Sequence, residues 1–278
     1  MNKFPALDPD AIVVTRDALH AYARILGDWL KSTRAQRKHW WHASLRPSLS
    51  GLTTGVIHNN IDFEIELNLQ ESVISVRTST GERMCESLHG QPATQVAARI
   101  SSFLESAGVS AKPQGDAGDG DASAVVGYSP EEASKLGQAL RAVSAALVAF
   151  RAGIREESSP IQVWPHHFDL SMIWLPGPKI PDQDPANEEY ADKQMNFGFV
   201  FGDESFTEPY FYVTAYPLPD AMRQIELPAG STWKSEGFSG AVLLYKDLVA
   251  TADPAVYLQE LWATLLAAGQ THLATNET

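Results

Sequence analysis

The strongest constraint on the fold of this chain is a run of strictly alternating residues, "IDFEIELNL" at 61–69. One side of an extended chain would carry only apolar residues there: Phe63, Ile65, Leu67 and Leu69. Because side chains alternate between the two faces of a strand, the pattern predicts a strand with one buried face. The runs "SVISVRTS" (72–79) and "RMCESL" (83–88) follow after short polar turns. They are predicted to extend a hairpin-based antiparallel sheet.

One helix is predicted before this strand block in the sequence and another after it. Residues 15–32 carry apolar side chains at three- and four-residue spacing, which is typical of an amphipathic helix. His20 falls on the polar side of that helix, where we expect solvent. Residues 93–108 form a second such pattern, and Gly108 stands where a helix commonly ends in a left-handed residue.

Two further helices are predicted in the second half of the chain. Ser129 followed by Pro130 is a strong start signal for a helix over 129–153. The last helix has Asp253 before Pro254 and is predicted to end at Gly269.

The domain organisation is predicted from residues 111–128, which are rich in Gly, Ala and Asp and offer almost nothing to bury. They indicate a flexible linker or long loop between a first half, 1–110, and a second half, 129–278. Both halves follow a similar order of elements. We therefore predict an α+β fold, a mostly antiparallel sheet flanked by helices, built from two pseudo-repeated α-β-β-β-α halves in one compact unit.

Composition excludes some function classes. The net charge of −13 would repel nucleic acids and anionic membranes, so neither is an expected partner. The basic stretch at 31–38 is interpreted as a solvated helix end. The sequence has neither a signal-peptide pattern nor an apolar run long enough for a membrane span. Its single cysteine, Cys85, is expected to be a buried structural thiol in a reducing, cytoplasmic protein.

Two stretches suggest a functional site, "HWWH" at 39–42 and "VWPHHFD" at 163–169. Both are predicted to be strands at equivalent places in the two halves. If equivalent elements meet near a pseudo-symmetry axis, the two stretches would line a pocket at the junction of the halves. We expect the ligand-contacting residues to be these: Trp40, Trp41, Trp164, His166 and Tyr210.

The chemistry of such a site would fall to His42, His167 and Asp169. On a strand, His167 and Asp169 share a face, and a carboxylate beside an imidazole fixes its tautomer and raises its basicity. The set suits a general acid–base site, with His167 assisted by Asp169. It equally suits a divalent metal held by two histidines and a carboxylate. The cofactor is otherwise unknown.

A structural interpretation stands beside the functional one. Tryptophan is mostly buried in proteins, so the three tryptophans would be core residues and the histidines would bond to backbone. The alternating tyrosines at 207–217, including Tyr210, line a pocket or, as we favour, stabilise a sheet through cross-strand aromatic pairs.

The order of several motifs resembles an uncharacterised bacterial family, the domain of unknown function numbered 5996. The motifs that carry the resemblance are "LHAYARILG" (19–27), "HWWH" (39–42), "GLTT" (51–54), "FEIELN" (63–68), "SPIQVWPHHFDL" (159–170), "EPYFYVTAYP" (208–217) and "ADP" (252–254). The resemblance implies one full-length family domain. It brings no activity, cofactor or catalytic residue.

The sequence therefore leads to two functional hypotheses. The first is a small-molecule enzyme or ligand binder with a Trp/His-lined pocket between the halves. The alternative is a non-catalytic structural or protein-interaction protein whose Trp/His motifs serve the core. The substrate, the oligomeric state and the question of catalysis itself are not determined by the sequence.

Overall fold

The computed structural model describes residues 4–115, 127–203 and 206–274. The chain forms two compact units, which are considered separately. The N-terminal unit comprises Leu7–Arg141 and Gln162–Asp169, and the C-terminal unit comprises Met1–Ala6, Ala142–Ile161 and Leu170–Thr278. The predicted linker at 111–128 lies mainly outside the described residues.

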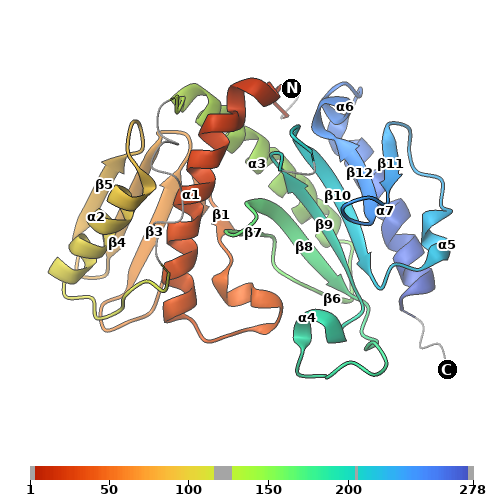
Figure 1. The fold of residues 1–278 in the computed structure, drawn as a ribbon, viewed down its shortest axis with the longest axis horizontal. Helices are drawn as coiled ribbons and strands as arrows, with labels where there is room; N and C mark the ends of the chain where they lie inside the picture. The colour runs from red at the N-terminus through yellow and green to blue at the C-terminus, as the bar shows by residue number, and fades with distance from the viewer. Residues whose placement is uncertain (1–3, 116–126, 204–205, 275–278) are drawn as a thin grey trace. The chain divides into compact units, whose positions relative to one another are not determined.

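The N-terminal unit is an antiparallel sheet with helices on one face. Its elements are α1 (Pro9–Thr33), the 3-10 helix η1 (Lys38–Ala43), β1 (Arg46–Pro47), β2 (Gly51–Thr53), β3 (Phe63–Asn68), β4 (Val73–Thr78), β5 (Arg83–Ser87), α2 (Ala93–Ser106), the first part of α3 (Pro130–Arg151) and β7 (Gln162–Trp164). The strand order is β1-β2-β3-β4-β5. Helices α1 and α2 contact each other and pack on β3 and β5 (Figure 1).

The core of this unit follows from the alternation in β3. Phe63, Ile65 and Leu67 are buried, as predicted, and face the helices. Trp29 of α1 meets Phe63 edge to face, with ring centroids 5.4 Å apart. Burial of such large side chains is the main favourable contribution to folding. Helix α1 begins earlier than predicted, because Asp8 caps it by accepting the N–H of Asp10 at 3.1 Å.

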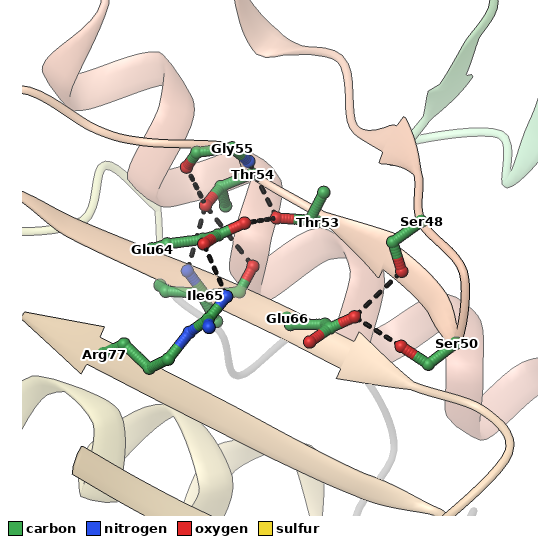
Figure 2. A network of polar contacts seen from close by, with 9 residues as sticks. All are labelled: Ser48, Ser50, Thr53, Thr54, Gly55, Glu64, Ile65, Glu66 and Arg77. Atoms are coloured by element: carbon green, nitrogen blue, oxygen red, sulfur yellow. Dashed lines mark hydrogen bonds and ion pairs between the residues drawn. The ribbon is translucent and has the colours of Figure 1, made fainter.

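The opposite face of the same sheet is polar, and its two central carboxylates are occupied (Figure 2). Glu64 accepts hydrogen bonds from Thr53 at 2.6 Å and from Arg77 at 2.8 Å. Glu66 accepts hydrogen bonds from the hydroxyls of two serines, Ser48 and Ser50. Both glutamates are thus half-buried parts of a hydrogen-bonded network that ties β2 and the preceding turn to β3.

Cys85 is exposed, which corrects the prediction of a buried thiol. It is the register partner of Ser75 on β4, and the residues on either side of Ser75, Ile74 and Val76, are the buried ones. Alternation therefore directs Cys85 to the polar face of the sheet.

The C-terminal unit contains the second sheet, of strand order β11-β12-β10-β9-β8-β6. Its elements are β6 (Glu157–Ser158), β8 (Asp169–Leu175), α4 (Glu188–Ala191), β9 (Gln194–Val200), β10 (Tyr210–Tyr216), α5 (Asp220–Arg223), β11 (Ser231–Lys234), β12 (Gly240–Leu244), α6 (Tyr245–Val249) and α7 (Pro254–His272). Every strand pair of known register in the two sheets is antiparallel. The predicted α+β class is confirmed, and the internal duplication stays a prediction.

Helix boundaries confirm most of the sequence signals. Gly108 follows α2 with a φ of 83°, Ser129 accepts the N–H of Glu132 at 3.2 Å, and Asp253 accepts the N–H of Val256. The prediction that Gly269 ends the last helix is wrong, because α7 continues to His272. A Cβ at Gly269 would lie 2.2 Å from the sulfur of Met195, so glycine permits close packing of α7 on β9.

Candidate functional site

The segment "HWWH" is a turn and not a strand, which corrects the prediction. It forms η1, in which His39 and Trp40 adopt left-handed backbone with φ of 50° and 57°. For residues other than glycine this conformation costs roughly 1–2 kcal/mol each. Because the segment is not a strand, alternation does not assign its side chains to opposite faces. Left-handed residues outside glycine concentrate at functional sites, which makes this turn a candidate.

Side-chain contacts hold the turn in this shape. The Trp40 ring stacks on His42 with centroids 5.6 Å apart, and His39 contacts Trp41 at 6.0 Å. Nδ1 of His42 accepts the backbone N–H of Arg37 at 3.2 Å, which defines the neutral ring as the Nε2–H tautomer. His42 is buried, whereas Trp40 remains 48% exposed.

The second predicted segment is also mostly a turn. Strand β7 ends at Trp164, residues 165–168 form a turn, and β8 begins at Asp169. The backbone N–H of Phe168 donates to the carbonyl oxygen of Trp164 at 2.7 Å. His167 is therefore in the turn and does not share a strand face with Asp169, which corrects the alternation argument. His166 and His167 are both exposed, with ring centroids 4.3 Å apart.

Strand pairing brings the two segments next to each other within the N-terminal unit. Leu45, just after η1, pairs with Val163 through two backbone hydrogen bonds of 2.9 and 3.0 Å. Ser44 and Arg46 flank Leu45, and Gln162 precedes Val163. Oε1 of Gln162 accepts hydrogen bonds from the hydroxyl of Ser44 at 2.8 Å and from Arg46 at 2.9 Å. Two segments more than a hundred residues apart in the sequence thus form one polar, hydrogen-bonded junction.

Helix α1 packs against both turns. A Cβ at Gly27 would lie 2.8 Å from the ring of Pro165 and 3.9 Å from the carbonyl oxygen of Ala43, so glycine lets both turns approach the helix. His20, about two turns before Gly27 on the same face of α1, stacks on Phe168 at 5.5 Å and lies 3.2 Å from the carbonyl oxygen of His166 through Nε2. The prediction that His20 faces solvent is therefore wrong. We call η1, residues 164–168 and the adjoining side of α1 the Trp/His surface.

Burial is the main influence on the histidines of the Trp/His surface, and it lowers their pKa values. Desolvation lowers the pKa of His20 to about 4, and the charge of Arg24 acts in the same direction. His166 is exposed as a residue, but its ring is packed against other rings. Partial desolvation, followed by the charges of His167 and Lys31, lowers the pKa of His166 to about 4.

Burial and neighbouring charges also lower pKa values in and beside η1. Burial lowers the pKa of His42, and the charges of Arg34 and Lys31 add to the effect. Burial also lowers the pKa of Arg46, again with a contribution from Arg34. Lys31 itself is paired with Asp28 of the same helix at 3.6 Å.

The predicted site residues are thus partly assembled. The N-terminal unit contains His42, His167, Asp169, Trp40, Trp41, Trp164 and His166. Within the described residues, His167 makes no hydrogen bond to His42 or Asp169. The same part of the chain holds no group of three His, Cys, Asp or Glu side chains placed to bind a metal ion. Catalytic roles for these residues stay predictions.

Tyr210 belongs to the C-terminal unit and serves its sheet. It is buried with Val200 and Val242, and its hydroxyl donates to Asp203 at 2.7 Å. Its ring contacts Phe206 at 4.8 Å. These contacts support the sheet role over the pocket role for this tyrosine.

Sequence reasoning missed several residues of the site. His20, Gln162, Arg34 and Arg46 were not among the candidates. The basic stretch at 31–38 contains Arg34, and its pattern favours a solvated helix end. Arg34 is instead half-buried, and its guanidinium donates to the carbonyl oxygens of Thr54 and Val56.

A family model matches residues 4–276, which is nearly the whole chain. The chain belongs to the family of unknown function DUF5996. The predicted resemblance is thereby confirmed, and the two turns of the Trp/His surface lie inside the matched region of this DUF5996 protein. No curated protein and no solved structure matches it. None of the helices in the described residues has both the length and the apolar character that a membrane span needs.

Proposed function

We propose that this DUF5996 protein binds a small organic molecule at its Trp/His surface. The observation that carries the proposal is Trp40, which is 48% exposed, held in left-handed backbone and stacked on His42. An exposed tryptophan with a fixed ring loses little conformational freedom on binding and offers a large apolar contact area.

The surroundings of Trp40 support binding over a purely structural role. Of the three tryptophans, Trp164 is buried in the core, whereas Trp41 is only partly buried and Trp40 is half exposed, so a core role accounts for Trp164 but not for Trp40. The strained turn is held by contacts to α1 and to β7, which is how a preorganised ligand contact is built.

Catalysis is a narrower hypothesis at the same place. His42, His167 and Asp169 remain the proposed acid–base residues, with a divalent metal as the proposed alternative. Binding is the better supported part, because His167 has no hydrogen bond to Asp169 in the described part of the chain. A protein-interaction role is the rival, and it would use Trp40 as an anchor on a partner.

A fragment screen by ligand-observed NMR tests the proposal, using aromatic small molecules and the purified full chain. We expect fragments that bind the wild type and lose binding in Trp40→Ala. Leu49→Ala is the matched control, since Leu49 is 86% exposed in the same unit. If no fragment depends on Trp40, the small-molecule proposal fails.

A further inference from the structure

We infer that strand β5 is a self-association edge, at which two copies of this chain pair their β5 strands antiparallel and form one continuous sheet. The inference is independent of the proposed ligand site. Strand β5 lies at one end of the strand order of the N-terminal sheet, and β1, which follows η1, lies at the other (Figure 1). An edge strand presents unpaired backbone groups that a second strand can bond.

The first step is the direction of the backbone groups of β5. At one end of the strand, Leu88 donates its N–H to the carbonyl oxygen of Ser72 at 2.9 Å. At the other end, the carbonyl oxygen of Glu82 accepts the N–H of Thr78 at 3.1 Å. Bonded and non-bonded pairs alternate in an antiparallel ladder, so the even-numbered residues of β5 bond to β4. The N–H and C=O groups of the odd-numbered residues therefore point away from β4: Arg83, Cys85 and Ser87.

The second step is that this edge is open. The side chains of Arg83, Cys85 and Ser87 are exposed. Natural edge strands are commonly protected by a proline or a bulge. Strand β5 has no proline, and its register with β4 runs over five consecutive residues without a bulge. The charge of Glu86 is offset by Arg99 of α2 at 2.6 Å. The edge is thus flat, continuous and accessible to another strand.

The third step selects a second copy as the partner. A twofold axis through the middle of β5 places Cys85 opposite its own copy, Arg83 opposite Ser87, and Met84 opposite Glu86. In this register every outward N–H and C=O of the three odd-numbered residues finds a partner. No two like charges face each other.

The neighbouring symmetric registers are less favourable. A shift in one direction places Glu82 opposite Glu86, and a shift in the other places Glu86 opposite its own copy. Like charges directly opposite each other destabilise a sheet. Each shift also leaves some of the outward backbone groups of β5 unpaired. The register centred on Cys85 is the one that combines full backbone bonding with compatible charges.

The single cysteine of the chain gives a direct readout of this pairing. Opposed residues of a bonded pair lie about 5.5 Å apart between Cα atoms, so a short bismaleimide should join two Cys85 thiols into a covalent dimer. Without the reagent, sedimentation of the full chain at about 0.1 mM should show a reversible dimer, because so small an interface is weak. A monomer in sedimentation, or a dimer whose Cys85 thiols do not crosslink, overturns the inference.

Charge variants at Ser87 test the register itself. Ser87→Lys puts a lysine opposite Arg83 at both ends of the interface and should weaken the dimer about threefold to tenfold. Ser87→Glu should strengthen it by a similar factor. Arg83→Glu combined with Ser87→Lys restores opposite charges and should recover the wild-type affinity or exceed it.

The matched control is Ser106→Lys, which adds the same charge at an exposed position at the end of α2. It should leave the dimer unchanged. All these substitutions are at exposed side chains, so the folded monomer should persist in each. A dimer that responds equally to Ser87→Lys and to Ser106→Lys overturns the inference.

Discussion

The imidazole of His20 on α1 stacks on the ring of Phe168 at an interplanar angle of 12°, while its Nε2 faces the carbonyl oxygen of His166. A helix near the N-terminus and a turn in the second half of the sequence are thereby joined by a neutral histidine. Burial is the main cause of its lowered pKa, followed by the charge of Arg24, while the carbonyl groups of His166 and Pro165 and the charge of Asp17 act in the opposite direction.

This contact predicts a pH dependence of stability. The pKa of His20 falls to about 4 in the folded protein from 6.5 in the unfolded chain. Between these values the unfolded state binds more protons, so the free energy of unfolding decreases as the pH falls from about 6.5 to about 4. We expect His20→Gln to remove about 1–2 kcal/mol of that decrease. Urea unfolding across this range checks it. The exposed His89→Gln should keep the wild-type slope, and an equal slope in His20→Gln contradicts the prediction.

Trp40 is predicted to matter for binding and not for stability. Trp40→Asn keeps a residue that tolerates left-handed backbone and removes a half-exposed ring. The free energy of unfolding should change by less than about 1 kcal/mol, while Trp40-dependent fragment binding is lost. By contrast, Trp29→Ala, at a fully buried position, should cost about 3–5 kcal/mol. A comparable loss in Trp40→Asn would favour the core interpretation.

Gly27 is predicted to set the distance between α1 and the turn at 165. Alanine at an open helix position is usually favourable by up to about 1 kcal/mol. Here its Cβ would lie 2.8 Å from Pro165, so we expect Gly27→Ala to cost about 1–3 kcal/mol. A double-mutant cycle with Pro165→Gly measures the contact, since the second change removes the atoms that clash. Additive losses in the cycle would mean that the two residues do not interact.

Tyr210 is predicted to act in the sheet of the C-terminal unit. Tyr210→Phe removes the donor to Asp203 and should lower the free energy of unfolding by about 0.5–1.5 kcal/mol. Fragment binding at the Trp/His surface should be unchanged, measured on the same preparation. Weakened binding in a variant of normal stability would return Tyr210 to the list of ligand contacts.

The regular elements could be predicted from the sequence because their signals are local. Alternation over 61–69 determines β3, since a one-residue shift would move Phe63 out of the core. Helix starts at Pro130 and Pro254 follow from capping residues one position earlier. The DUF5996 resemblance rests on similarly local motifs.

The shape of the Trp/His surface could not be predicted from local sequence patterns, because it depends on tertiary contacts. "HWWH" and "PHHF" have no periodicity, and left-handed backbone at Trp40 and Phe168 has no sequence signal outside glycine. Those turns are held by partners remote in the chain: Leu45 on Val163, and Gly27 under Pro165. Burial of Arg34 and Arg46 was equally hidden, because a basic stretch looks the same whether water or protein surrounds it. Local sequence patterns are therefore enough for strands β3 to β5, for the long helices and for the family, whereas the placement of the two histidine turns follows from contacts between segments far apart in the chain.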